Sequence, residues 1–243
     1  MENRKIEKLV MPSTEKLSFL EEKEPFVDVE KYTKGKVVAD MQYNKQGRNG
    51  AISTAYLRKT VVEKLLQAAA FLPEGYALKI FDAWRPYEVQ KSLYDEYYER
   101  VKAENPTLTE EQLHEKAKTF VSFPDKTKQF AYVHSSGGAV DLTIVDEKGV
   151  ELDMGTPFDD FSALSATCVL EEGAENLQAR DNRRLLYNAM TKAGFTNYPS
   201  EWWHYDYGDI FWGAMTGCPV KYSSVYTKEE ILEISNNGGA VEI

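Results

Sequence analysis

The chain has 243 residues, 42% hydrophobic and 28% charged, which is typical of a soluble globular protein and excludes a disordered or fibrous chain. Its net charge of −10 disfavours a broad nucleic-acid surface, because such a surface needs clustered Lys and Arg. The longest nearly apolar stretch, Leu65 to Leu72, is far shorter than the roughly 18–20 residues of a membrane helix, and the N-terminus has no apolar signal segment. We therefore expect a cytoplasmic protein with no nucleic-acid or membrane partner, and the oligomeric state stays open.

The first third of the chain predicts an arm, a helix and a strand. Residues 1–35 are rich in Lys and Glu with weak periodicity, which is typical of an irregular arm on the surface. Apolar residues recur on one helical stripe from Ala55 to Leu72, and Pro73 ends this helix. The short apolar run Ala77–Phe81 then predicts a buried strand.

The next segment is charged and predicts two helices. Pro86 suits the first turn of a helix over Tyr87–Lys102. Thr109–Gln112 has the form of a capping box, which begins another helix toward Val121. We interpret the stretch Tyr98–Lys128 as a peripheral helical excursion, and this stretch and Ser162–Arg180 as insertions near the mouth of a pocket.

The second half predicts a hairpin, a helix and a further strand. Ala139–Val145 is strand-like, and Asp146–Gly149 is a good turn into a second strand over Val150–Met154. A helix over Asn182–Ala193 ends at a glycine that suits a left-handed cap. The aromatic string Glu201–Tyr205 favours a strand.

One domain accounts for this order of elements. Residues 1–35 form the expected N-terminal arm, 36–225 the domain, and 226–243 a short helix with a tail. A capping box at Thr227–Glu230 begins that helix, and Asn237–Gly239 begins a frayed tail. The order predicts an α+β fold: a single compact domain with helices packed on a small, mostly antiparallel sheet.

Three residues that attract attention favour structural roles. Cys168 and Cys218 have no histidine nearby in the sequence, so we expect reduced, core-packed thiols and no catalytic thiol. His114 lies on a charged helical face, and Lys118 stands where a zincin has its second histidine. We therefore expect His114 to be a solvated surface residue.

The segment from His134 to Asp141 contains a candidate pair of metal ligands. Two glycines between the imidazole and the carboxylate let the backbone turn tightly, so both side chains can reach one point despite their odd offset. The segment also fits a glycine-rich hairpin in which Asp141 is a capping residue. Both interpretations stay open from this segment alone.

Glu201 and His204 form a weaker E-x-x-H pattern, in which the two side chains meet only if the strand bends. Together, His134, Asp141 and His204 are the usual three ligands of a catalytic zinc ion whose fourth position is left to water. Glu201 is then the candidate general base, and Arg85 could stabilise a developing oxyanion. The alternative for Arg85 is a salt-bridged surface residue that caps the following helix.

Three motifs carry a family resemblance: residues 82–86 (DAWRP), 134–141 (HSSGGAVD) and 201–205 (EWWHY). In this order and spacing they resemble the VanX-type D-alanyl-D-alanine dipeptidases, zinc peptidases related to the D,D-carboxypeptidases. Met154–Asp159 and Asn182–Arg184 also look like landmarks of the family. The resemblance runs from about residue 40 to residue 220.

This resemblance implies a compact α+β fold of the Hedgehog and D,D-peptidase type, with one Zn²⁺ per chain held by His134, Asp141 and His204. It implies Glu201 as the base and Arg85 as the group that binds substrate and stabilises the tetrahedral intermediate. The implied reaction links the protein to peptidoglycan metabolism, with antibiotic resistance or D-alanine recovery as alternative roles.

The implied substrate is a small dipeptide, D-alanyl-D-alanine, whose ammonium group pairs with Asp159 or, as a substitute, with Asp160. Tyr132 stands where the family usually has a serine, two residues before the first histidine. Two alternatives to a dipeptidase remain. One is a D,D- or L,D-carboxypeptidase that acts on longer cell-wall peptides, and the other is a zinc-stabilised binding module without turnover.

Overall fold

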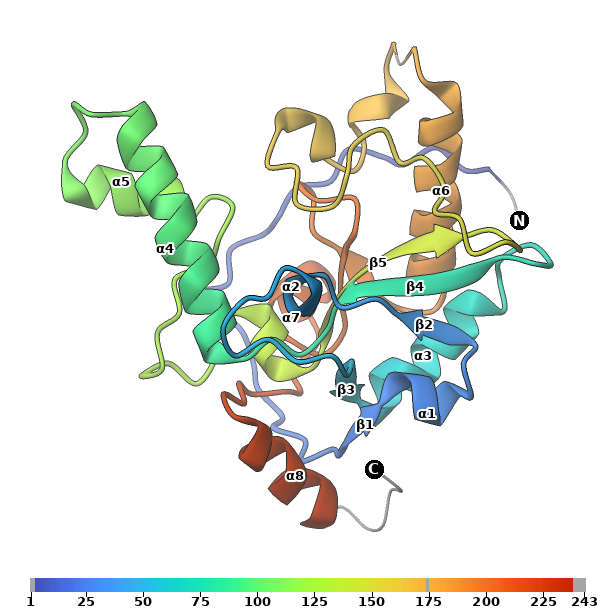
Figure 1. Ribbon diagram of the computed structural model, residues 1–243, viewed down its shortest axis with the longest axis horizontal. Coiled ribbons are helices and arrows are strands. Elements are labelled where there is room, and N and C mark those ends of the chain that lie inside the picture. Colours follow the sequence, from blue (N-terminus) through green and yellow to red (C-terminus); the bar gives the residue numbers. More distant parts are fainter. Residues whose placement is uncertain (1–2, 174, 238–243) are drawn as a thin grey trace.

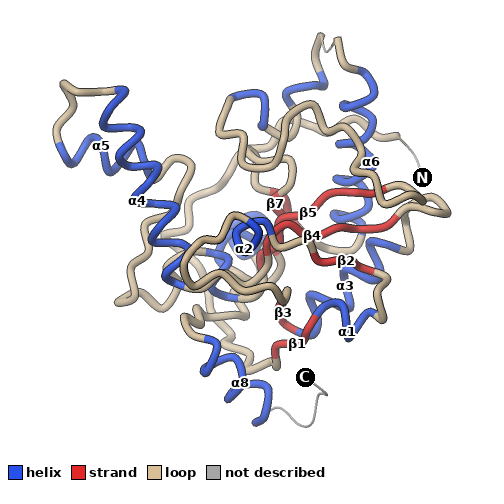
Figure 2. The backbone as a smooth tube through the Cα atoms, in the orientation of Figure 1, coloured by secondary structure: helices blue, strands red, loops and turns tan. Residues whose placement is uncertain are grey.

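The computed structural model describes residues 3–173 and 175–237 (Figure 1). A central sheet has the strand order β2-β4-β5-β7-β6, in which β2 and β4 are parallel and the other neighbours are antiparallel (Figure 2). A separate antiparallel pair joins β1 and β3. The strands are β1 Phe26–Asp28, β2 Val37–Ala39, β3 Tyr56–Arg58, β4 Ala77–Asp82, β5 Ala139–Val145, β6 Thr196–Asn197 and β7 His204–Asp206.

Helices surround this sheet, and three short 3₁₀ helices, at Val133–Ser136, Ala163–Ser165 and Val169–Glu171, lie in the connections. The α-helices are α1 Val29–Thr33, α2 Gln42–Lys45, α3 Lys59–Ala69, α4 Tyr87–Glu104, α5 Glu110–Ala117, α6 Leu177–Lys192, α7 Ile210–Thr216 and α8 Lys228–Asn237. The paired helices α4 and α5 project away from the sheet (Figure 1). The predicted α+β class with a mostly antiparallel sheet is confirmed.

Alternation along β4 and β5 gives the sheet one apolar face and one polar face. Ile80 on β4 pairs with Leu142 on β5, and both side chains are fully buried in the main core with Leu65 of α3 and Leu186 of α6. Successive side chains on a strand point to opposite faces. Asp141 therefore lies on the face of the sheet that is opposite to Leu142. The core formed with α3 and α6 packs against the other face of the same strands.

Two predictions for the first part of the chain are wrong in their bounds. The expected irregular arm of residues 1–35 is irregular over the described residues 3–25 but then contains β1 and α1, where Phe26 and Val29 are buried. The expected helix from Ala55 begins only at Lys59, because Tyr56–Arg58 pairs with β1 as strand β3. Helical periodicity cannot reveal this difference, since the strand partner lies 30 residues away. The domain boundaries at 35 and 225 stay a prediction.

Most other elements lie where the sequence predicts them: β4, α4, α5 with its Thr109 capping box, and β5. The second strand of the expected hairpin is wrong, because Val150–Met154 makes only the isolated bridge between Val145 and Glu151. Side chains of α6 bind the carbonyls of Asp153 and Met154 and so draw the chain away from the sheet. Helix α6 begins at Leu177, earlier than predicted, because Asn176 caps it.

The prediction that His114 is a solvated surface residue is wrong. His114 is half-buried, its Nδ1 forms a hydrogen bond with the Tyr94 hydroxyl at 2.6 Å, and its ring stacks on Tyr98. Cys218 is exposed and Cys168 is only partly buried, so the prediction of core-packed thiols is wrong as well.

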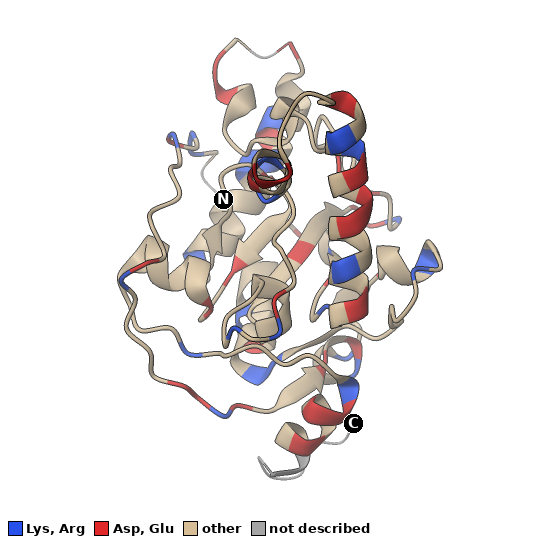
Figure 3. Ribbon diagram, turned by 90° about the vertical axis from the view of Figure 1, so that its left-hand side faces the viewer, with Lys and Arg blue, Asp and Glu red and all other residues tan. Residues whose placement is uncertain are grey.

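The C-terminal helix agrees with its capping box: Thr227 accepts a hydrogen bond from the Glu230 amide, and the Glu230 carboxylate accepts one from the Thr227 amide. The predicted tail at Gly238 and beyond lies outside the described residues. Basic and acidic residues are interspersed over the face drawn in Figure 3. Among the described helices, none has both the length and the apolar character required to cross a bilayer.

Candidate metal centre

Strand register places three polar side chains in one row across the polar face of the sheet. Asp82 at the end of β4 is opposite Asp141 on β5, and Asp141 is opposite His204 at the start of β7. All three are buried. Directly opposed residues of antiparallel strands have neighbouring side chains, so the sheet itself sets the spacing of this row.

His134 reaches the same row from the 3₁₀ helix Val133–Ser136. Gly137 ends this helix in a left-handed conformation with φ of 72°, and β5 starts two residues later. The tight turn resolves the odd offset between His134 and Asp141, since only the aspartate lies on the strand. The bend required for the E-x-x-H pattern is present too, because Glu201 lies in the turn before β7 and not on the strand predicted for Glu201–Tyr205.

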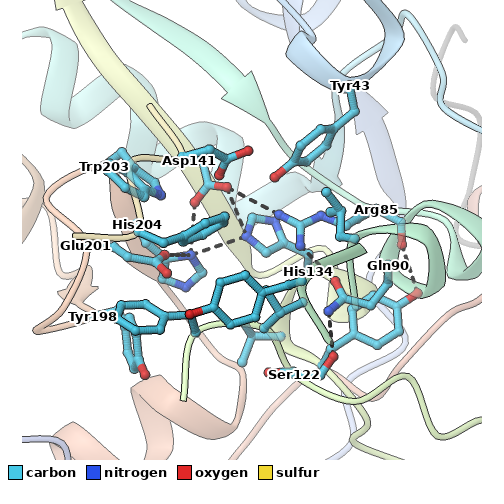
Figure 4. Close-up of a pocket in the computed structure, with 18 of the residues that line it drawn as sticks. Tyr43, Arg85, Gln90, Ser122, His134, Asp141, Tyr198, Glu201, Trp203 and His204 are labelled. Carbon is cyan, nitrogen blue, oxygen red and sulfur yellow. Dashed lines mark hydrogen bonds and ion pairs between the residues drawn. The ribbon is translucent and has the colours of Figure 1, made fainter. Parts of the chain in front are cut away.

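The three predicted ligand side chains converge on one point (Figure 4). His134 Nε2 lies 3.2 Å from His204 Nδ1 and 3.3 Å from Asp141 Oδ2. His204 Nδ1 lies 2.9 Å from Asp141 Oδ1. The sequence alternative of a hairpin with a capping aspartate does not explain this meeting with a third residue.

The outer nitrogen of each imidazole determines which nitrogen faces the centre. His134 Nδ1 lies 2.8 Å from the carbonyl oxygen of Ala83, and His204 Nε2 lies 2.8 Å from a carboxylate oxygen of Asp206. Both partners are acceptors, so these outer nitrogens donate. The lone pairs of the inner nitrogens and the Asp141 carboxylate then point toward one common centre. Three acceptors that converge in this way require a cation or a proton between them.

These donors fit a metal ion. Nitrogen–metal lengths near 2.0–2.1 Å give a tetrahedral site donor–donor edges of about 3.3 Å. The observed separations of 3.2, 3.3 and 2.9 Å are close to this value. Two imidazoles and one carboxylate are also the ligand types of open catalytic zinc sites, and Ala83 and Asp206 supply the outer hydrogen bonds that hold such imidazoles in place.

Electrostatics also favours a cation at this centre. Burial acts to raise the pKa of the Asp141 carboxyl, but the imidazoles of His134 and His204 hold it below its usual range. Burial disfavours a charged His204, but the carboxylates of Asp206 and Asp141 raise its pKa well above the usual value. The buried carboxylates therefore stabilise positive charge at the point where the donors meet.

Arg85 approaches the centre from the turn after β4 and is held by three partners. Its Nε donates to Asp82 at 2.7 Å, its Nη1 donates to Gln90 at 2.7 Å, and its Nη2 lies 3.4 Å from Asp141 Oδ2. The guanidinium also lies 5.0 Å from the centroid of the Tyr43 ring. The alternative of an exposed helix-capping arginine is wrong, since only 9% of Arg85 is exposed.

Glu201 lies on the other side of the centre, with Oε2 3.9 Å from His204 Nδ1. Burial raises the pKa of Glu201 to about 8. Its side chain is close to the converging donors, and among the described residues it forms no hydrogen bond with His134 or Asp141. The carboxylate is therefore placed beside the centre and not within the set of three.

A cavity of about 410 Å³ opens over these groups, and its lining includes Asp159. Desolvation and the nearby Asp141 carboxylate raise the pKa of Asp159 to about 7, although a hydrogen bond from Tyr43 opposes this. Asp160, the alternative, instead accepts a hydrogen bond from the Ser162 hydroxyl. Helix α4 and the segment that follows α5, from Lys118 to Ser122, contribute to the cavity wall, and the interpretation of this region as an insertion stays a prediction.

Sequence reasoning missed four residues around this centre. Asp206 could have been found, because it lies two residues after His204 and therefore on the same strand face. Asp82 stands in the DAWRP motif but was not assigned. Gln90 and Tyr43 gave no signal, since helices α4 and α2, which carry them, reach the site only through the fold. Tyr132, noted as a departure, is buried and donates to the Arg85 carbonyl at 3.0 Å.

An α+β sheet that carries three converging donors, with a fixed guanidinium and a further carboxylate beside them, defines the class of open mononuclear metal sites found in hydrolases. The chain belongs to the peptidase M15 family, described as D-ala-D-ala dipeptidase, whose family model matches residues 32–224. The resemblance predicted from the three motifs is therefore confirmed.

Individual relatives agree with this family. A D-alanyl-D-alanine dipeptidase of Synechocystis sp. is 30% identical over 185 residues, which cover 69% of this chain and 73% of the relative. One from Enterococcus faecalis is 30% identical over 158 residues, covering 65% and 73%. A solved structure of the vancomycin resistance D,D-pentapeptidase VanY, as a mutant in complex with Zn(II), aligns with a TM-score of 0.41 and 20% identity over 75% of this chain and 86% of that one.

Proposed function

We propose that this protein is a zinc-dependent dipeptidase that hydrolyses D-alanyl-D-alanine to two molecules of D-alanine. One observation carries the proposal: His134 Nε2, Asp141 and His204 Nδ1 converge within 4.8 Å of one another, in a family described as D-ala-D-ala dipeptidase. The metal is zinc because two imidazoles and one carboxylate are its usual catalytic ligands. We also propose a cytoplasmic location for the enzyme.

His134, Asp141 and His204 would hold the zinc ion, which would supply a Lewis acid to polarise the peptide carbonyl and to lower the pKa of a bound water toward about 7. Glu201 accepts the proton of the attacking water and then donates it to the nitrogen of the departing D-alanine. Water is consumed, the C–N bond breaks, and two amino acids form.

Arg85 stabilises the negative charge that develops on the carbonyl oxygen. Its Nε and Nη1 are held by Asp82 and Gln90, while Nη2 faces Asp141 and the centre. A donor fixed before the reaction loses no free energy in reorganising during it. Arg85 is thus both a catalytic and a substrate-binding residue in this proposal.

Asp159 binds the ammonium group of the substrate. The carboxylate lines the same cavity as Glu201 and Arg85, and the Arg85 guanidinium and the Tyr43 hydroxyl both act to lower the pKa of Asp159, which favours its charged form. An anionic partner for the ammonium explains a preference for a free amino terminus, because a neutral acylated terminus leaves the buried carboxylate without its counter-ion.

A hydrolysis assay tests the function. We would incubate zinc-loaded and chelator-treated protein with D-Ala-D-Ala, L-Ala-D-Ala, L-Ala-L-Ala and N-acetyl-D-Ala-D-Ala and measure free alanine. We expect metal-dependent cleavage of free D-Ala-D-Ala above all others. Preference for the acetylated peptide would instead support a carboxypeptidase, and zinc binding without any cleavage would support a binding module.

A further inference from the structure

Arg183 on α6 is a buried cation whose hydrogen bonds within the described residues all go to backbone carbonyls. The residue is 2% exposed. Its Nε donates to Met154 at 2.7 Å, its Nη1 to Ala166 at 2.8 Å and its Nη2 to Leu164 at 2.9 Å. Within the part of the chain that the structure describes, no carboxylate forms an ion pair with it. Burial lowers the pKa of Arg183 to about 10, so the guanidinium is still charged at neutral pH.

These three carbonyls belong to the two ends of one segment, residues 154–166, which we name the Asp159 loop. A buried charge is costly unless it is hydrogen-bonded, so the guanidinium keeps its position only while both ends of the loop stay against it. Gly155, next to Met154, has a φ of 85°, and a Cβ placed there would lie only 3.3 Å from Cβ of Ala179 on α6, so a glycine lets this end of the loop lie close to the helix that carries Arg183. Arg183 therefore joins the two ends of the loop.

The middle of the loop carries Asp159 in a conformation that needs support. Asp159 has a φ of 60°, in the left-handed region that non-glycine residues seldom adopt. Such a conformation is strained and persists only where the surrounding structure holds it. The neighbouring Phe158 packs on Phe81 and Trp203 at centroid distances of 4.9 and 5.5 Å, which fixes the loop against the core.

We propose that Arg183 is a positioning residue for substrate recognition: by joining the ends of the Asp159 loop, it holds the Asp159 carboxylate where the substrate's ammonium group binds. This inference rests on the proposed function, because it needs Asp159 to bind that ammonium group. Arg183 touches neither substrate nor metal. Its loss lets the loop relax and moves the carboxylate, while His134, Asp141 and His204 lie on other elements and keep their places.

Kinetics of three variants test this role. Arg183→Lys retains the charge but cannot reach three carbonyls at once, and Arg183→Met removes the charge. Arg184→Met is the matched control, because Arg184 is the next residue of α6 and binds Glu171. We expect both Arg183 variants to raise KM for D-Ala-D-Ala by about tenfold or more with kcat within about threefold, since ammonium binding is the same in the ground and transition states. Arg183→Lys should lose less than Arg183→Met, and the control should retain the KM of the parent.

A double-mutant cycle identifies the residue through which Arg183 acts. If it acts through Asp159, then Arg183→Lys added to Asp159→Asn costs little beyond Asp159→Asn alone. Additive effects, an unchanged KM in Arg183→Lys, or an equal rise in KM in Arg184→Met would overturn the inference. If Arg183→Met does not fold, the KM of Arg183→Lys and its double-mutant cycle with Asp159→Asn decide the test.

A binding measurement separates this inference from the proposed function. We would titrate the zinc-loaded variants with a phosphinate analogue of D-Ala-D-Ala and with the same analogue lacking its amino group. The expected result is a loss of about tenfold for the amino analogue only. Equal losses for both analogues, or no loss for either, overturn the role of Arg183. Absence of peptide cleavage by the parent protein overturns the proposed function. In that case the affinities for the two analogues still test whether Arg183 acts on the binding of the amino group.

Discussion

The Nε2 atom of His204 lies 2.8 Å from a carboxylate oxygen of Asp206, two residues further along β7. The contact follows from the strand, because residues two apart share a face. It fixes the His204 ring so that Nδ1 faces Asp141 at 2.9 Å. A partner on the outer nitrogen both orients a metal-binding imidazole and makes it more basic.

Asp206→Asn should therefore weaken zinc binding by about 10–100-fold without unfolding the protein. The amide retains the shape but loses the charge that supports the imidazole. Competition with a chromogenic chelator measures the affinity. Asp146→Asn, in the turn after β5, is the control and should bind zinc as the parent does; an unchanged affinity in Asp206→Asn would contradict the assigned contact.

Glu201→Gln should abolish hydrolysis of D-Ala-D-Ala while the zinc content stays near one ion per chain. The amide cannot accept a proton, and removing such a base lowers the rate by about 10²–10⁴-fold. Glu201 lies beside the donor set and not in it, so metal binding is independent of it. Metal analysis and a progress curve on the same preparation check both statements. Loss of zinc together with activity would make Glu201 a ligand and not the base.

Arg85→Lys should lower kcat by about 10²–10³-fold. An ammonium group cannot bind Asp82 and Gln90 and still present a donor to the carbonyl oxygen, because it lacks the planar arrangement of the guanidinium. Steady-state kinetics with D-Ala-D-Ala measure the effect. A rise in KM with kcat unchanged would mean that Arg85 only binds substrate and has no part in stabilising the transition state.

The sequence predicts those parts of the fold that local pattern determines. Strand β5 alternates apolar side chains with Asp141 and Thr143, and this local pattern predicts it at its observed limits, Ala139–Val145. The three-residue strand β3 was not, because Tyr56–Arg58 continues the helical stripe of α3 and becomes a strand only by pairing with Phe26–Asp28. Short strands of this kind depend on a partner that no local window contains.

The candidate site likewise contains residues that local motifs predict and residues that only the fold brings into it. His134, Asp141, Glu201 and His204 stand in motifs whose spacing permits a common centre, and their assignment needed no knowledge of the sheet. The row of Asp82, Asp141 and His204 depends on strand register, which the motifs do not state. Tyr43 lines the cavity from α2, a four-residue helix that neither motif nor periodicity marks.

Removal of zinc should leave the protein folded but less stable. The main core lies on the other face of the sheet from the donors and is built from α3, α6 and the strands, so its packing is independent of the ion. Free zinc at 100 times its dissociation constant adds about 2.7 kcal/mol to the free energy of unfolding, and a chelator removes this contribution. Circular dichroism during thermal unfolding, with and without chelator, measures the change. Loss of helical signal at room temperature on chelation would instead identify a structural zinc site.

Gly137→Ala should destabilise the protein by about 3 kcal/mol or more and weaken zinc binding, because two costs add. Gly137 has a φ of 72°, and a Cβ placed there would lie 2.2 Å from Cε1 of Phe26. The Phe26 ring cannot move freely, since the Arg58 guanidinium lies 4.1 Å from its centroid. Any shift of Gly137 also moves the 3₁₀ helix that carries His134.

Gly149→Ala separates the two costs. Gly149 has a nearly equal φ of 77°, but a Cβ there would meet no atom within 4 Å. This control should lose only the backbone contribution, about 1 kcal/mol, and retain its zinc affinity. Urea denaturation of both variants gives the two free energies of unfolding. Equal losses would mean that the contact with Phe26 contributes nothing, and that the ring does not hold the turn that brings His134 to the metal.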